Sequence, residues 1–116
     1  MRMYLYGPDI DDFELFAFSF RVKSNKGTSR DSNANPSNLF TVMMDDSDAF
    51  DSLFGLFCSG TNFDEAWVST PTYTGFYHRF TKALMNSASI ISKDNDGNPK
   101  YSIGWQYKDY SMAKDS

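Results

Sequence analysis

The sequence feature that most constrains the fold is a run of regularly spaced aromatic residues between Phe13 and Val22. The run reads F-E-L-F-A-F-S-F-R-V, so that Phe16, Phe18 and Phe20 are separated by single residues. Successive side chains of a β-strand point to opposite faces of a sheet, and this period-two spacing therefore predicts one strand with a phenylalanine face. We expect the strand to lie centrally in a sheet, with its phenylalanine face covered.

Length and composition fit a single ordered domain. The chain has 116 residues, of which 41% are hydrophobic and 17% aromatic. A chain of this length can bury a core without disulfide bonds or metal, and a disordered chain contains far fewer aromatic residues. Apolar runs stay much shorter than the roughly 20 residues of a membrane-spanning helix. The first residues also lack the apolar stretch of a signal peptide.

The cysteine and histidine counts restrict the chemistry. Cys58 is the only cysteine and His78 the only histidine. A single thiol favours a reducing compartment, and we therefore expect a cytoplasmic protein. A zinc site of the usual Cys/His kind is excluded by the supply of ligands.

Hydrophobic periodicity and turn signals predict six strands in all. These strands are expected at residues 2–6, 13–22, 39–44, 63–69, 89–93 and 100–107. The last one alternates cleanly, because one face holds Tyr101, Ile103, Trp105 and Tyr107. Residues 24–38 contain no large apolar side chain and are expected to form a long polar loop.

Two amphipathic helices are expected between these strands. The first starts at Asp46 or Ser47, both good N-cap residues, and ends at Gly60. Its apolar arc comprises Ala49, Phe50, Leu53, Phe54, Leu56 and Phe57. The second starts at Thr70 and Pro71 and runs to about residue 87. Its apolar stripe comprises Tyr73, Phe76, Tyr77, Phe80, Ala83 and Leu84.

The sequence thus predicts an α+β fold. We expect one two-layer domain over residues 1–107, in which two amphipathic helices cover one face of a mostly antiparallel sheet of about five or six strands. Residues 108–116 are expected to form a polar C-terminal tail.

The negative charge of the chain is concentrated in what we call the acidic band. The formal net charge is −4. Residues 45–65 contain no lysine or arginine, and they hold all members of the band: Asp45, Asp46, Asp48, Asp51, Asp64 and Glu65. Acidic surface repels phosphate, so direct binding of nucleic acid is disfavoured, and a protein with a basic surface is the expected partner.

Motifs for catalysis, metal binding and RNA binding are incomplete. Residues 92–97 match the start of an EF-hand loop, but Ile103 stands where a bidentate glutamate is required. The Phe16–Phe20 segment is similar to part of the RNP1 motif of RNA-binding domains, but Glu14 and Leu15 replace its basic residue and glycine. Cys58 lies near the C-terminal end of its helix, where no dipole activates a thiol. We therefore expect a non-enzymatic protein without cofactor or metal.

Two functions remain open for a non-enzymatic protein, and the enzymatic alternative is a small hydrolase or nuclease that uses the aspartate clusters with a metal. In its size, acidity and aromatic content the chain resembles phage-encoded inhibitors of the anti-CRISPR type and bacterial immunity proteins. This resemblance implies an inhibitor whose acidic band docks on a basic surface of a nucleic-acid-handling protein. The alternative is a structural or assembly subunit of a phage or other macromolecular complex, in which polar segments become ordered on contact with neighbours.

Overall fold

The computed structural model describes all residues except 8–9, 25–34, 70–74, 94 and 115–116, and within this part it contains eight strands and one helix. The strands are β1 (Arg2–Gly7), β2 (Ile10–Phe16), β3 (Ser19–Ser24), β4 (Asn35–Met44), β5 (Asn62–Ser69), β6 (Phe76–Lys93), β7 (Pro99–Tyr107) and β8 (Asp109–Lys114). The helix, α1, spans Ser47–Cys58.

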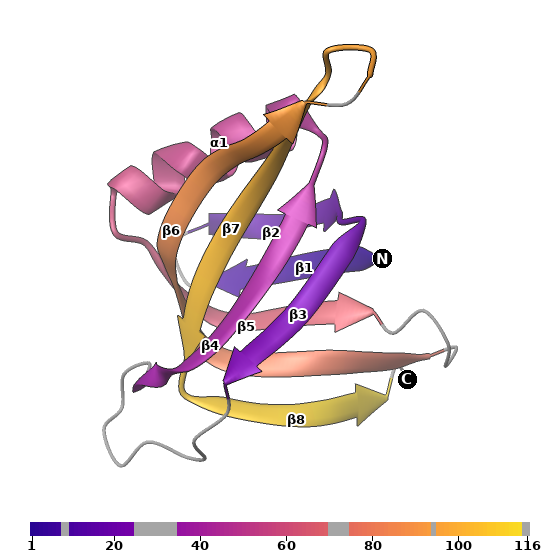
Figure 1. The fold of residues 1–116 in the computed structure, drawn as a ribbon. Coiled ribbons are helices and arrows are strands. Elements are labelled where there is room, and N and C mark those ends of the chain that lie inside the picture. Colours follow the sequence, from indigo (N-terminus) through magenta and orange to yellow (C-terminus); the bar gives the residue numbers. More distant parts are fainter. Residues whose placement is uncertain (8–9, 25–34, 70–74, 94, 115–116) are drawn as a thin grey trace.

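All strand pairs are antiparallel, and the long strand β6 joins two groups of them. The strand order is β2-β1-β5-β6-β7-β4-β3, with β8 pairing to β6 as well. The first half of β6 lies between β5 and β8, and its second half pairs with β7. Figure 1 shows β6 curving from the group of β1, β2, β5 and β8 into the steeper group of β3, β4 and β7.

The core lies between these two groups of strands and is built from stacked aromatic rings. The rings of Phe40 in β4 and Phe80 in β6 stack with centroids 4.0 Å apart, and Trp105 in β7 stacks on Phe40 at 5.7 Å. Tyr101, Ile103, Trp105 and Tyr107 are all buried. The predicted alternation of residues 100–107, which form most of β7, is therefore confirmed.

Helix α1 is the one predicted helix that the structure confirms. The Asp46 side chain caps it, accepting hydrogen bonds from the backbone N–H groups of Asp48 at 3.0 Å and Ala49 at 3.2 Å. Ala49, Phe50 and Leu53 are buried. The Phe50 ring stacks on Tyr101 of β7 with centroids 4.1 Å apart, so α1 covers one end of the core.

The predicted α+β fold with two helices is wrong, because residues of the expected second helix belong to β6. Two irregularities explain the error. At Lys82, whose φ is 52°, the alternation slips, so that Phe80 and Ala83 both face the core although they are three residues apart. A β-bulge follows between Met85 and Ser87. These offsets give a strand the apolar spacing of a helix. The expected helix start at Thr70 and Pro71 lies outside the described residues.

The prediction that residues 13–22 form one central strand with a covered phenylalanine face is also wrong. The run is divided between β2 and β3, because the chain crosses there from β1 to β4: the Ala17 N–H donates to the Met1 carbonyl and the Phe18 N–H to the Met43 carbonyl. Leu15 and Ala17 are buried instead, whereas Phe16 is 57% exposed and Phe18 46% exposed. Phe20 does pack inward, against Phe40 and Phe80.

Two polar segments contain strands rather than only loop or tail. Residues 109–114 of the expected C-terminal tail form β8, which pairs with β6 along six residue pairs. Of the expected 24–38 loop, the last residues belong to β4, and Asn38 is fully buried with its Nδ2 donating to the Lys108 carbonyl at 3.1 Å. Residues 25–34 of that loop lie outside the described part.

Candidate interaction surface

The structure divides the acidic band into two places. Asp45 and Asp46 precede α1, and Asp48 and Asp51 lie exposed in its N-terminal half. The other two acids, Asp64 and Glu65, lie in β5, which follows the opposite end of the helix. Twelve helical residues span roughly 18 Å. Asp64 and Glu65 thus follow the C-terminal end of the helix, whereas the other four acids lie at or before its N-terminal half.

Three members of the band are already engaged within the chain. Asp46 is the N-cap of α1. Asp64 pairs with Lys82 at 3.7 Å, and Glu65 pairs with Arg79 while it also accepts a hydrogen bond from the Trp67 indole at 3.1 Å. Among the described residues, no cation lies within ion-pair distance of Asp45, Asp48 or Asp51. We call these three residues the helix acids.

A second surface lies on the outer face of the sheet formed by β3, β4, β7 and β6. Because Tyr101, Ile103 and Trp105 point into the core, Ser102 and Gly104 face outward. Cross-strand pairing aligns Gly104 with Thr41 and Ser87, and it aligns Ser102 with Met43 and Ser89. We call this surface the polar trough, and it consists of Ser19, Arg21, Thr41, Ser87, Ser102 and Gly104.

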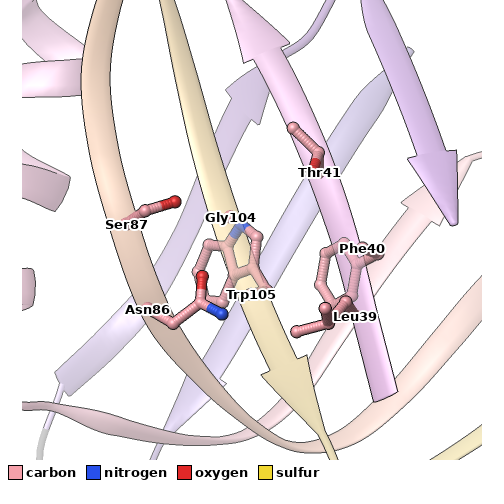
Figure 2. A pocket seen from close by; sticks show the side chains of 7 residues that line it. All are labelled: Leu39, Phe40, Thr41, Asn86, Ser87, Gly104 and Trp105. Carbon is pink, nitrogen blue, oxygen red and sulfur yellow. The ribbon is translucent and has the colours of Figure 1, made fainter. Parts of the chain in front are cut away.

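The trough contains two small cavities of about 190 Å³ each. Figure 2 shows the first one, where Asn86 and Ser87 of β6 lie beside Gly104 of β7. A side chain at Gly104 would fill this space, since its Cβ would lie 2.5 Å from the Ser87 Oγ and 2.7 Å from the Asn86 Oδ1. Sites for small molecules usually measure about 300 to 1,000 Å³. Each cavity therefore suits one side chain or a few waters.

Thr41 lies where the two cavities meet, because it lines both. Its side chain is buried, with 8% exposure, and its Oγ1 has no hydrogen-bond partner among the described residues. An unpaired buried hydroxyl is unfavourable by about 1 to 3 kcal/mol. Arg21 lines the second cavity, is exposed, and has no ion-pair partner among the described residues. The trough thus holds an exposed guanidinium next to a buried hydroxyl group that has no partner among the described residues.

Cys58 and His78 lie in surroundings that the sequence did not predict. Cys58 is exposed at the C-terminal end of α1. His78 falls within the range of the expected second helix, but it lies in β6 with its ring 4.8 Å from that of Phe20. Its Nδ1 is 2.7 Å from the Tyr110 hydroxyl, and burial lowers the pKa of His78. No group of three metal-ligating side chains occurs in the described part of the chain.

Aromatic residues on the outer face of β1, β5 and β6 form a third feature, which sequence reasoning missed. Tyr4, Tyr6, Trp67 and Tyr77 are partly exposed and contact one another, with ring centroids 5.6 to 6.2 Å apart. The sequence holds one sign of this cluster in β1, where Tyr4 and Tyr6 alternate with the buried residues Met3 and Leu5 and must therefore face outward. Exposed aromatic clusters of this kind are typical of surfaces that contact other proteins.

No helix of the described residues is both long and apolar enough to cross a membrane.

Comparison with known proteins finds similar structures but no similar sequences. No protein-family model matches the chain, and no curated protein matches it. The structure of Hcp2 from Salmonella typhimurium superposes with a TM-score of 0.62 at 16% identity, over 100% of this chain and 87% of that one.

Two further structures have the same fold. One is a type six secretion system protein, with a TM-score of 0.61 at 16% identity over 96% of this chain and 82% of the other. The second belongs to the baseplate of the anti-feeding prophage, solved with six-fold symmetry, and gives a TM-score of 0.56 at 12% identity over 97% and 91%. The chain therefore has the β-rich fold of these proteins over nearly its whole length.

Proposed function

We propose that this protein is a non-enzymatic structural subunit that assembles with copies of itself in a secretion or baseplate complex. The observation that carries the proposal is the similarity in fold to a type six secretion system protein and to a baseplate chain. The similarity spans nearly the whole of each chain, as expected of a subunit rather than of a shared small module.

The surface features of the chain support assembly. Large apolar side chains are exposed at Phe16, Phe18, Phe54 and Ile90, and β2 and β3 stand at the two ends of the strand order in the described part of the chain. Exposed apolar side chains and edge strands favour association with further chains. The cavities of the trough are too small for a substrate of ordinary size. These features agree with a structural role better than with catalysis.

The comparisons do not support the inhibitor hypothesis, and three residues of the acidic band are already engaged within the chain. The assembly alternative therefore replaces it. A neighbouring copy, rather than a basic nucleic-acid-handling protein, becomes the expected partner. The single thiol still favours assembly in the cytoplasm of the producing cell.

Light scattering after size exclusion tests the proposal. We expect a closed oligomer, and six copies are the expected number because the similar baseplate was solved with six-fold symmetry. Negative-stain electron microscopy should then show rings, since identical chains joined by rotation form closed cyclic assemblies. A protein that keeps the mass of one chain, 13.2 kDa, at high concentration and low salt would contradict the proposal.

A further inference from the structure

The helix acids and the polar trough are complementary in charge and chemistry. We infer that the trough of one copy binds the helix acids of a neighbouring copy, with carboxylates of Asp48 and Asp51 placed against Arg21 and the Thr41 hydroxyl. This inference rests on the proposed assembly, because its partner is a second copy of the chain. It adds which surfaces meet and which atoms pair.

The trough has the donors that a carboxylate requires. A guanidinium and a hydroxyl both donate hydrogen bonds to carboxylate oxygens, and such charge-assisted bonds are the strong ones in proteins. The Thr41 hydroxyl is buried beside both cavities and has no partner within the described residues. A cavity of about 190 Å³ has room for one acidic side chain. A docked carboxylate would give this hydroxyl the partner that the single chain does not provide.

The helix acids have the opposite requirement. Asp48 and Asp51 are exposed on α1, and no cation among the described residues pairs with Asp45, Asp48 or Asp51. Phe54, one turn further along the helix, is 43% exposed and would add apolar contact at the same place. The trough thus supplies a positive charge to the helix acids, and the helix acids supply negative charge to Arg21.

The topology places these surfaces on opposite sides of one sheet. Helix α1 packs on the inner face of β7 through the Phe50–Tyr101 stack, whereas the trough opens on the outer face, where Ser102 and Gly104 lie. One chain therefore cannot join its own helix acids to its own trough. Two different surfaces that meet between copies form a head-to-tail contact, and such contacts generate rings when the rotation closes.

Charge reversal tests the inference. Arg21→Glu, or Asp48→Lys with Asp51→Lys, should shift the oligomer to single chains and weaken association by about 100-fold or more. Lys114→Glu is the matched control for Arg21→Glu, because it makes the same charge change at an exposed position of β8, and it should leave assembly intact. Circular dichroism and melting temperature check that each variant folds.

Mixing the two reversed variants gives the sharpest result. In the mixture, an unchanged aspartate helix meets an unchanged arginine trough at every second contact. At the other contacts, the lysine-bearing helix of one variant meets the trough of the other, which carries the Arg21→Glu substitution. Both contacts are attractive, so an alternating ring should form from two proteins that do not assemble alone. A mixture that stays dissociated, while both variants are folded, would overturn the inference.

Thr41→Val separates a role in assembly from a role in folding. Loss of the hydroxyl removes an unpaired buried group from the single chain, so the melting temperature of the dissociated protein should stay equal or rise. Assembly should nevertheless weaken. Oligomers of unchanged affinity in both Thr41→Val and Arg21→Glu would refute the inference while leaving the proposed function standing. If the unmodified protein never assembles, the proposed function fails first.

Discussion

Phe80 and Phe18 carry the same side chain in very different surroundings. Phe80 is fully buried and contacts the rings of Phe40 and Tyr107 at 4.0 and 4.8 Å. Phe80→Ala should therefore lower the free energy of unfolding by about 3 to 5 kcal/mol. Phe18 is 46% exposed and contributes mainly the stacking of Lys100 on its ring at 4.8 Å. Phe18→Ala should lower it by about 1 kcal/mol or less. Urea unfolding of both variants measures the difference, and equal losses would contradict these core assignments.

His78 makes stability depend on pH. Burial between Phe20 and Tyr110 lowers the pKa of this histidine below its ordinary value. Between that lowered pKa and about 6.5, the unfolded chain binds more protons than the folded chain. The contribution of His78 to stability is thus complete above about pH 6.5 and is lost as the pH falls through the lowered pKa.

The variant His78→Gln isolates this effect, because carboxylates titrate alike in both proteins. The melting temperature of the unmodified protein should fall more steeply from neutral to mildly acidic pH than that of the variant. Parallel melting curves over this range would show that His78 does not contribute.

At the scale of elements, β8 should be necessary for a stable sheet. It pairs with the first half of β6, and Tyr110 packs on Phe80 with ring centroids 5.2 Å apart. A chain that ends at Tyr107 would leave this edge of β6 open and expose part of the core. We expect its free energy of unfolding to fall by at least about 2 kcal/mol. The control ends at Lys114, so it keeps β8 and should unfold like the full chain. A truncation at Tyr107 without loss of stability would show that β8 is dispensable.

The sequence predicts those elements that keep one period along their length. Helix α1 has a cap at Asp46 and an apolar arc that is uninterrupted, and β7 alternates without irregularity from Tyr101 to Tyr107. β6 could not be predicted, because its alternation is interrupted twice. The slip at Lys82 and the bulge at Met85 each change whether even-numbered or odd-numbered residues point into the core. The division of the phenylalanine run depends on hydrogen bonds to Met1 and Met43, which are distant in sequence.

The candidate site was only half predictable for a related reason. A cluster of acidic residues is visible in the sequence, and the helix acids were part of the predicted acidic band. The trough depends on cross-strand neighbours from β3, β4, β6 and β7, and its members are mostly small residues that have no pattern of their own. Their significance arises only when pairing leaves Thr41 buried and unpaired beside Arg21.

At the scale of the whole molecule, assembly and folding should be linked. The helix acids and the trough exist as surfaces only when α1 is packed on Tyr101 and the strands are paired. A neighbouring copy thus binds the folded chain and not the unfolded chain. By mass action, the folded state becomes more stable as the protein concentration rises. The stability of a chain that does not assemble is independent of protein concentration.

The melting temperature should therefore rise with protein concentration. Over an about hundredfold range, each tenfold increase should add on the order of 1 kcal/mol to the free energy of unfolding of each subunit. The dependence should vanish in Arg21→Glu and persist in Lys114→Glu, because only the first change removes the trough cation. Scanning calorimetry at several concentrations measures it. If the melting temperature of the unmodified protein is independent of concentration under conditions where it is oligomeric, contacts between copies do not require the folded surfaces described above.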